Sequence, residues 1–300
     1  MKNLILISIL IICPLTIQIK AQESGDPIVK MNNEKDAKLR FGIKGISSIG
    51  WLMPENTRRF SRYELGLGYG WGLNLEMRIN KTTSFRTGFS LTNFKAGLNY
   101  FDDELPQHEE TYYVVKDFEF VEWESNGTAP DGEIFQLLNR KYNLSYVNIP
   151  LILKLKTNEI GYLTYFGEFG GLLSLKTKAS VEDRSIPLND TLAPLSSEAF
   201  STFEDLDLNS GTQPFRAGLS LGAGAEYNFS GSTSLFFQVN WNYFVTNVLT
   251  KQDNEKYLRT FEDGVFEPLG AKSIPGRVSI TVGILSVSYT HLTLPTSYAV

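Results

Sequence analysis

Apolar and polar residues alternate one by one along an unusually long stretch of the chain, from Tyr63 to Ile79. The odd positions are all apolar or aromatic, whereas the even positions are charged, polar or glycine, with four of the glycines in succession at Gly66, Gly68, Gly70 and Gly72. A period of two places the two sets on opposite faces of a β-strand. The stretch therefore predicts a long strand with one apolar face and one face almost bare of side chains.

The same alternation recurs in seven further segments, and no helical period separates them. These segments are 41–51, 85–100, 147–155, 163–175, 215–229, 235–245 and 278–284. Within 85–100 the apolar phase shifts, so that Phe94, Ala96, Leu98 and Tyr100 align, which indicates a bulge or the emergence of the strand from a buried zone. The pattern predicts an all-β chain of eight antiparallel strands.

The connections between these strands are alternately short and long. Tight turns are predicted at 80–82, 156–161 and 230–233, and a modest connection at "PENTRRFS". Three long acidic segments are predicted at roughly 102–140, 178–213 and 250–275. Short turns at one end and long loops at the other are typical of an up-and-down transmembrane β-barrel. A spanning strand needs about 9–11 residues, so several of these strands are expected to project beyond the bilayer.

In a barrel of eight strands the interior is just wide enough for side chains to fill it. The apolar faces are then expected to meet lipid, with the glycine-rich faces inside. There the glycines would leave room for Arg86, Arg216 and Glu226 and permit sharp curvature. Aromatic residues near the strand ends are predicted to form the interfacial girdles: Trp51, Tyr63, Tyr100, Tyr162, Tyr227, Phe229 and Tyr243.

A soluble, lipocalin-like barrel is the alternative fold, because it shows the same alternation with its apolar face turned inward around a ligand. Alternation alone does not say which face points inward. Four successive glycines facing water would be unusual, however, and the apolar faces are long and uniform. The membrane interpretation is therefore favoured.

The first residues carry the pattern of a secretory signal peptide. Lys2 precedes an apolar run from Leu4 to Ile17, and Ala21 provides a small residue for cleavage. We therefore expect a signal peptide at 1–21, a disordered periplasmic linker at 22–37 and an outer-membrane barrel at 38–286. Cys13 is the only cysteine, so the mature chain is expected to have no disulfide and no thiolate metal site.

Charge and composition exclude some partners. Without Lys2 and Lys20 the chain keeps 26 basic against 33 acidic residues, a net charge of −7, which argues against nucleic acid as a partner. Between Asp102 and Glu133 there are eleven acidic residues and one lysine. Their spacing matches no loop that supplies Ca²⁺ ligands in a defined order, so a hydrated or protein-docking surface is favoured. Within this segment, 112–124 is β-prone and predicts a hairpin above the membrane.

The mature chain offers few candidates for catalysis. Its two histidines are His108, which lies among acidic residues of the first long segment, and His291. A solvated loop histidine is the simpler interpretation of His108, so no catalytic, cofactor-binding or metal-binding residue and no cofactor is predicted. Nine charged residues are predicted to face inward and to pair into a plug rather than an ion pathway: Lys44, Glu64, Glu76, Arg78, Arg86, Glu168, Arg216, Glu226 and Arg277.

Several motifs together resemble the PorT-like outer-membrane β-barrel family of Bacteroidota, which are small barrels of the OmpA and OmpX type. They are the leader ending in "KAQ", the first-strand "RFGIKGI", the glycine-rich second strand, "YVNIPLILKLK" and "YFGEFGGLLSLK", between about Leu39 and Ile284. The resemblance implies a fold and a compartment. Because its founding members are implicated in type IX secretion, it also implies envelope or secretion proteins as partners, beside lipid and the barrel-assembly machinery.

The end of the chain departs from that family. The segment "VSYTHLTLPTSYAV", residues 287–300, resembles a translated sequencing adapter and has no alternating face. We therefore expect a non-native tail there, in place of the aromatic end that barrel assembly recognises. The sequence as a whole predicts a non-enzymatic structural or interaction protein of the outer membrane. A small pore or ligand carrier is the second hypothesis, and an outer-membrane hydrolase is the third.

Overall fold

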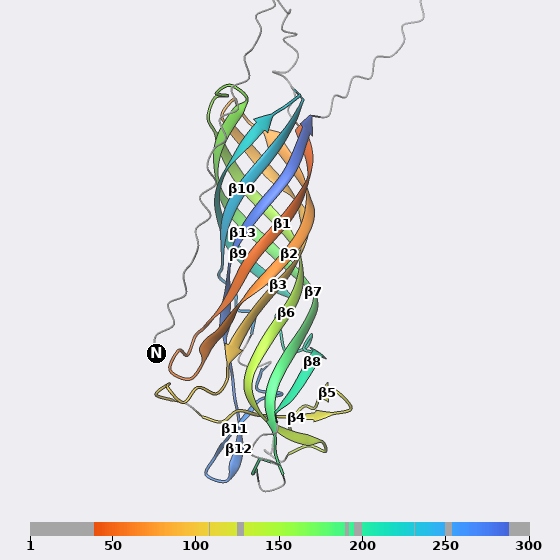
Figure 1. Ribbon diagram of the computed structural model, residues 1–300, viewed down its shortest axis with the longest axis vertical. Coiled ribbons are helices and arrows are strands. Elements are labelled where there is room, and N and C mark those ends of the chain that lie inside the picture. Colours follow the sequence, from red (N-terminus) through yellow and green to blue (C-terminus); the bar gives the residue numbers. More distant parts are fainter. Residues whose placement is uncertain are drawn as a thin grey trace, which may run out of the picture. The chain divides into compact units, whose positions relative to one another are not determined.

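The computed structural model describes residues 39–107, 109–124, 129–189, 192–194, 200–230, 232–249 and 254–287 (Figure 1). Within them, eight long strands pair antiparallel in a closed ring, since β1 pairs with both β2 and β13. In ring order they are β1 (Leu39–Pro54), β2 (Ser61–Arg78), β3 (Thr83–Asn99), β6 (Glu133–Lys156), β7 (Leu163–Pro187), β9 (Phe215–Asn228), β10 (Thr233–Phe244) and β13 (Ser273–Val287). The eight predicted strands are confirmed. Among the described residues there is no helix with the length and apolarity to cross a membrane.

The tight turns join β2 to β3, β6 to β7 and β9 to β10, and all lie at one end of the barrel, uppermost in Figure 1. The first of them is fixed by Asn80, whose side-chain oxygen accepts hydrogen bonds from the backbone N–H groups of Thr82 and Thr83 at 2.9 and 2.7 Å. Such a side-chain acceptor closes a turn without further residues. The predicted polarity of short and long connections is confirmed.

The three long segments are not purely loops, and in this respect the sequence prediction was wrong. β6 already begins at Glu133, β7 continues to Pro187 and β13 begins at Ser273. Five shorter strands add to the wall at the long-loop end: β4 (Tyr112–Lys116), β5 (Glu119–Phe120), β8 (Ser201–Asp207), β11 (Arg259–Glu262) and β12 (Val265–Pro268). The hairpin predicted within 112–124 is present as β4 and β5.

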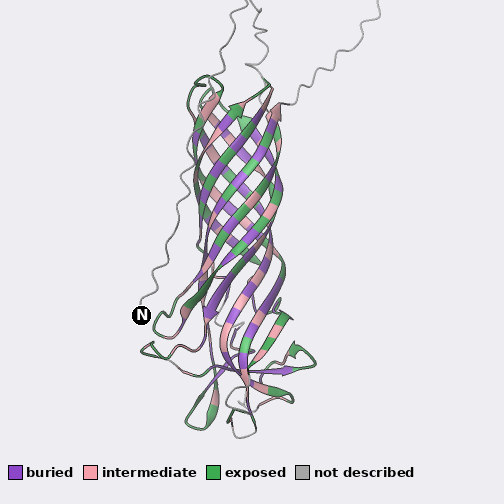
Figure 2. Cartoon of the chain, in the orientation of Figure 1, coloured by how far each residue is buried: buried purple, intermediate pink, exposed green. Residues whose placement is uncertain are grey.

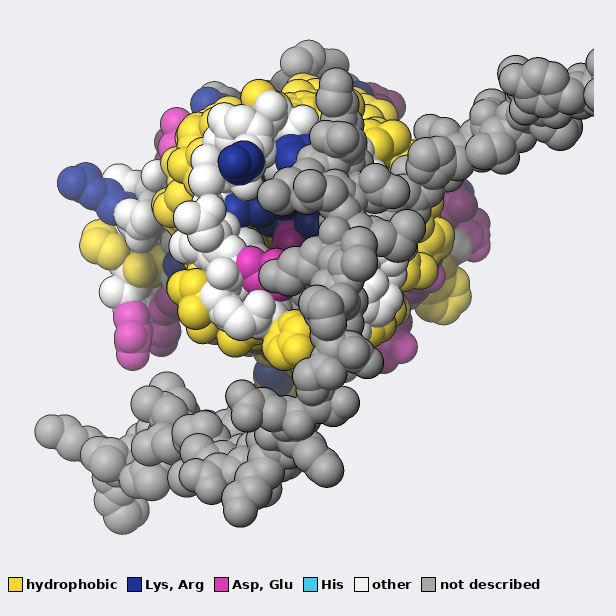
Figure 3. Space-filling view, turned by 90° about the horizontal axis from the view of Figure 1, so that it is seen from above, with side chains coloured by type: hydrophobic (Ala, Val, Ile, Leu, Met, Phe, Trp, Pro, Cys, Tyr) yellow, Lys and Arg dark blue, Asp and Glu magenta, His cyan; other side chains and the backbone are white. Residues whose placement is uncertain are grey.

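In the half of the barrel nearest the tight turns, here called the short-turn half, apolar side chains point outward. On β2, Leu67 and Tyr69 are 71% and 72% exposed, whereas Asn74 and Glu76 are buried inside. The alternation of exposed and buried positions is visible in Figure 2, and the end-on view in Figure 3 shows a hydrophobic rim around charged side chains. A lipocalin-like barrel requires the opposite facing, so that alternative was wrong.

In the other half, here called the long-loop half, the same strands reverse their chemistry. On β6, Tyr142 and Leu144 point inward and are fully buried, whereas Lys141 and Asn143 lie on the outer face. A contiguous apolar core fills the interior, including Leu52, Phe94, Leu98, Tyr100, Tyr142, Leu144, Ala179, Val181, Leu206 and Val248. The long-loop half is therefore built like a water-soluble β-protein.

Irregularities in strand pairing mark the boundary between the halves. The β2–β3 register shifts between the pairs Gly70↔Thr92 and Leu65↔Ala96, and the extra residue lies on β2. The bulge that the sequence offered as one alternative within 85–100 is therefore not on β3, whose pairing with β6 is regular. The inward positions of β3 nevertheless stay even-numbered, so Phe94 and Leu98 represent an inward face that turns from polar to apolar. Tyr100 follows them into the core, so its prediction as a girdle residue was wrong. The girdle residues Tyr63, Tyr162, Tyr227 and Phe229 are exposed, and Trp51 and Tyr243 are half-buried.

The glycine-rich face of β2 meets the backbone of β3. A side-chain carbon at Gly68 would fall on the carbonyl oxygen of Asn93, and one at Gly72 would lie 2.6 Å from the Cβ of Ser90. The glycines thus allow β2 to curl tightly against its neighbour. The sharp curvature that the glycines predict stays a prediction. The predicted role of making room for Arg86, Arg216 and Glu226 is not confirmed, because the atoms nearest to these glycines belong mainly to β3.

Candidate functional site

The polar interior of the short-turn half collects the charged side chains that the alternation directs inward. They form three layers. Counted from the tight turns, we call them the mouth layer, the middle layer and the deep layer. Each layer combines residues from several strands, because neighbouring strands in the ring are paired over nearly their full lengths. The layers therefore brace the barrel from within.

The mouth layer is a network of five charged side chains from four strands. Lys154 of β6 is fully buried and pairs with Glu76 of β2, at 2.9 Å, and with Glu226 of β9. Arg40 of β1 lies 2.8 Å from the Glu226 carboxylate, and Lys156 pairs with Glu76. Buried charges that are fully paired tolerate loss of water far better than isolated ones. The sequence predicted Glu76 and Glu226 as inward charges but missed Arg40, Lys154 and Lys156.

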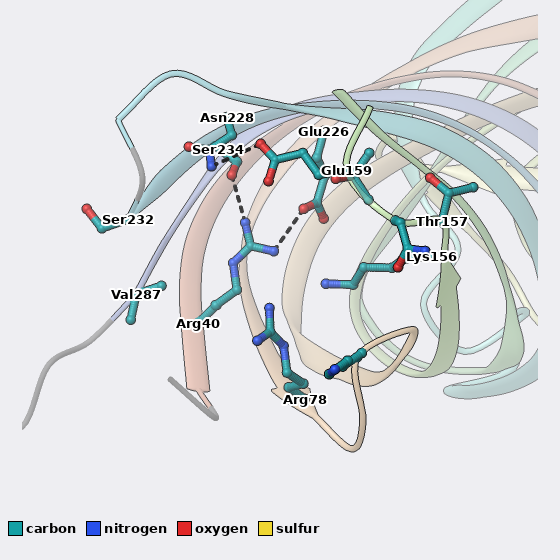
Figure 4. A pocket seen from close by; sticks show the side chains of 13 residues that line it. Arg40, Arg78, Lys156, Thr157, Glu159, Glu226, Asn228, Ser232, Ser234 and Val287 are labelled. Atoms are coloured by element: carbon teal, nitrogen blue, oxygen red, sulfur yellow. Dashed lines mark hydrogen bonds and ion pairs between the residues drawn. The ribbon is translucent and has the colours of Figure 1, made fainter. Parts of the chain in front are cut away.

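A cavity of about 330 Å³ opens beside the mouth layer at the tight-turn end. Figure 4 shows the Arg40 guanidinium joined to Glu226 and Ser234 in the wall of this cavity, with Arg78 beside them. Arg78 is exposed, and Lys81 of the adjacent turn also lines the cavity. Arg78 was predicted to be inside, but it lies near the end of β2, where the barrel interior meets solvent.

The middle layer centres on a buried pair of Arg86 from β3 and Glu168 from β7. Arg86 also donates to the side-chain oxygen of Gln238 at 2.6 Å, and Asn240 donates to Glu168. Lys44 and Arg277 lie in this region and line a smaller cavity of about 50 Å³. The predicted pairing of inward charges is thus confirmed for Arg86 with Glu168.

The deep layer contains Arg216, which has no carboxylate as an ion-pair partner among the described residues. Its guanidinium carbon lies 3.4 Å from the ring centre of Tyr146, 4.3 Å from that of Phe244 and 5.4 Å from that of Phe94. Cation–π contacts replace the predicted ion pair. Arg277 donates a hydrogen bond to the Thr92 hydroxyl at 3.2 Å. The prediction that all inward charges would pair was therefore wrong for both arginines.

The long-loop half contains a buried ion pair that the sequence analysis missed. Arg140 of β6 donates two hydrogen bonds to the Asp183 carboxylate of β7, each 2.6 Å long, and both side chains are fully buried. Burial alone lowers the pKa of Arg140, but the Asp183 carboxylate raises it above its usual range, so the guanidinium stays charged. Both residues fall in segments predicted as loops, where alternation gave no reason to expect a buried pair.

The remaining candidates lie outside this interior. Glu64 was predicted to point inward but is exposed and lies 3.2 Å from the Lys141 ammonium group. His108 and His291 lie outside the described residues, as do the predicted signal peptide, the linker and the tail from residue 288 onward. Within the described ranges, no group of three or more His, Cys, Asp or Glu side chains is arranged to hold a metal ion.

The ring of strands, the apolar outer face and the charged interior define an outer-membrane type of β-barrel. The family model described as "Outer membrane protein beta-barrel domain" matches residues 21–250, and the chain belongs to this family. It is thus an outer-membrane β-barrel protein. No curated protein sequence matches the chain.

Solved structures with a similar arrangement of strands include three bacterial surface barrels. OprG from Pseudomonas aeruginosa is 10% identical with a TM-score of 0.41, and the match covers 85% of this chain and 99% of OprG. Neisserial surface protein A is 11% identical with a TM-score of 0.36, covering 83% and 97%. Ail of Yersinia pestis is 10% identical with a TM-score of 0.30, covering 83% and 99%. At these values the likeness carries no inference about function.

Proposed function

We propose that this chain is a non-enzymatic interaction protein of the outer membrane, and that the long-loop half is its binding platform. The main support is that the barrel interior is filled. The long-loop half has a packed apolar core, and Arg216 with its aromatic neighbours fills the interior next to this core, on the side of the tight turns. A narrow barrel filled in this way is suited to holding a platform rigidly rather than to conducting solutes.

The platform carries acidic side chains and an aromatic tip. Asp117 and Phe118 form the turn between β4 and β5, both with positive φ angles of 52° and 63°. Phe118 is 79% exposed, and the neighbouring Glu119 and Glu122 are exposed as well. A phenylalanine in left-handed backbone is an unusual choice that exposes an apolar anchor within an acidic surface. This combination fits a basic protein partner, whose association acidic residues accelerate.

The proposal extends to compartment and context. With the tight turns in the periplasm and the platform outside, the protein follows the polarity of outer-membrane barrels. The resemblance to PorT-like barrels supports a role as an accessory of secretion or envelope assembly, with an envelope protein as partner. A small pore is the competing function, and the mouth cavity of about 330 Å³ is the observation in its favour.

Gentle detergent extraction of the tagged protein from native outer membranes tests the proposal. We expect one basic envelope protein to co-purify at near-equal stoichiometry, with an association that weakens as salt rises. Neutralising Asp117, Glu119 and Glu122 to Asn, Gln and Gln should abolish the association. The matched control Glu159→Gln, which removes one acidic charge near the tight turns, should leave it intact. A solitary barrel with a measurable conductance in planar bilayers would contradict the proposal and favour the pore.

A further inference from the structure

The interior of the short-turn half carries more positive than negative charge. Seven cationic side chains line it: Arg40, Lys44, Arg86, Lys154, Lys156, Arg216 and Arg277. They meet three carboxylates, those of Glu76, Glu168 and Glu226. The whole chain, by contrast, has a net charge of −5. The excess positive charge is therefore a local property of the lumen and not of the composition.

This excess is concentrated away from the mouth. Glu76 and Glu226 form ion pairs with the cationic side chains of the mouth layer, and Glu168 forms an ion pair with Arg86. Lys44 and Arg277 are each more than nine-tenths buried, and within the described part of the chain neither has a carboxylate within ion-pair distance. The Arg277 Nε–H also lacks a hydrogen-bond acceptor there.

Lys44 and Arg277 line one partly open cavity, together with the ion pair of Arg86 and Glu168. The cavity of the middle layer has a volume of about 50 Å³, and its wall includes Ser220, Asn242 and Ser279, whose side chains are able to donate hydrogen bonds. One water molecule occupies roughly 30 Å³ in the liquid, so a small ion fits, with little space for more. Because Glu168 pairs with Arg86, Lys44 and Arg277 leave an excess of positive charge around this cavity, and that excess favours an anion.

Elementary electrostatics favours compensation of this charge, above all that of the Arg277 guanidinium. An isolated buried cation is strongly unfavourable, and a guanidinium does not escape the cost by losing its proton. Water in the cavity would solvate the two groups but would leave their mutual repulsion. A monovalent anion in the cavity offsets this positive charge and supplies an acceptor for the Arg277 guanidinium.

We propose that the cavity lined by Lys44 and Arg277 binds a small inorganic anion of halide size, chloride in the first instance. The bound ion acts as a structural counter-ion that ties β1 to β13 and to the polar side chains of β9 and β10. Because it binds the folded barrel and not the unfolded chain, it stabilises the fold in proportion to its concentration. This inference is independent of the binding platform.

Crystals or thermal unfolding of the full chain in detergent give direct tests. After replacement of chloride by bromide, we expect an anomalous-scattering peak within the cavity, between Lys44 and Arg277. At constant ionic strength, the unfolding temperature followed by gel mobility should rise with chloride against gluconate and reach a plateau. Absence of the bromide peak at molar bromide, or equal unfolding temperatures in the two salts, would overturn the proposal.

Variants separate a bound ion from a general effect of salt. Lys44→Gln and Arg277→Gln should each remove the chloride dependence, and Ser279→Ala provides a milder change that weakens it if those variants do not fold. Lys95→Gln is the matched control, because Lys95 is an exposed lysine on the outer face of β3. It should keep the full chloride response. A response that persists unchanged in Ser279→Ala and in both charge variants would contradict the assignment of the site.

Discussion

The two halves of the barrel use the same strands with opposite chemistry. In the short-turn half of β6, Ile149 and Leu151 face outward and Asn148 and Lys154 face inward. In its long-loop half, Lys141 lies outside and Tyr142 and Leu144 lie inside. The alternation in the sequence is continuous, but its sign reverses. The surroundings of the strand, lipid in one half and water in the other, account for that reversal.

This difference decides what holds each half together. The interior of the short-turn half combines ion pairs and hydrogen bonds, such as Arg86 with Glu168 and Gln238, with separate buried apolar side chains such as Phe166 and Phe236. The long-loop half depends on apolar burial, with Arg140 and Asp183 as a polar exception inside the core. The bulges at the boundary let the wall change curvature where its contents change.

Breaking the buried ion pair of Arg140 and Asp183 should have the largest effect on stability. Asp183→Ala leaves Arg140 charged and unpaired in the apolar core, and we expect a loss of about 3–5 kcal/mol in the free energy of unfolding. Urea unfolding in detergent measures it. The control Asp131→Ala breaks an exposed pair with Lys116 and should have a far smaller effect, because water screens that pair. Equal costs for both variants would contradict the buried role of Asp183.

A reciprocal exchange on the outer face tests the surroundings of each half. Leu73→Arg places a charge among the apolar side chains of the short-turn half and should cost about 2–4 kcal/mol in a bilayer. Lys95→Leu places an apolar side chain on the outer face beyond the boundary, where surface changes stay within about 0.5 kcal/mol. Reversible unfolding in lipid vesicles gives both values. A harmless Leu73→Arg would show that the facing is wrong.

Disturbing the close approach of β2 to β3 should have a smaller effect on stability. Gly72→Ala pushes a methyl group against the Phe89 carbonyl and the Ser90 side chain, and we expect a loss of about 1–3 kcal/mol. Gly45 of β1 is the matched control, because an added Cβ there meets nothing within 4 Å. Gly45→Ala should therefore be neutral or slightly stabilising. Unfolding in detergent compares the two, and equal stability of both variants would exclude a steric role for the glycine face.

The sequence predicts the short-turn half well and the long-loop half poorly, for a physical reason. Alternation identified all eight wall strands and most inward charges, because a strand between lipid and a polar lumen has two very different faces. Where Phe94 and Leu98 fill the interior, the inward face of β3 becomes apolar although the strand keeps its phase. In the sequence alone, this change of chemistry looks like a shift of phase. Partners also escaped prediction: the aromatic cage of Arg216 is contributed by three other strands, β3, β6 and β10.

The acidic surface of the long-loop half predicts the smallest effect, a pH dependence. The neighbouring Glu109 carboxylate raises the pKa of Glu262 at the end of β11. Since the raised pKa belongs to the folded state, the contribution of Glu262 to stability is full below its unfolded pKa and is lost as pH rises through the folded value. NMR titration of the Glu262 carboxyl carbon should give a midpoint above that of ordinary glutamate. Glu109→Gln should lower this midpoint, and an unchanged midpoint would exclude the proposed cause.

The most direct test of the reversal is a spin-label scan along the outer face of β6 in lipid vesicles. Single cysteines replace Lys141, Asn143, Ser145, Val147, Ile149 and Leu151 in turn, and accessibility to oxygen and to a water-soluble nickel chelate is measured at each position. The account predicts nickel accessibility at the first three positions and oxygen accessibility at the last three, with the change between Ser145 and Val147. Equal accessibility to the nickel chelate at all six positions would contradict it.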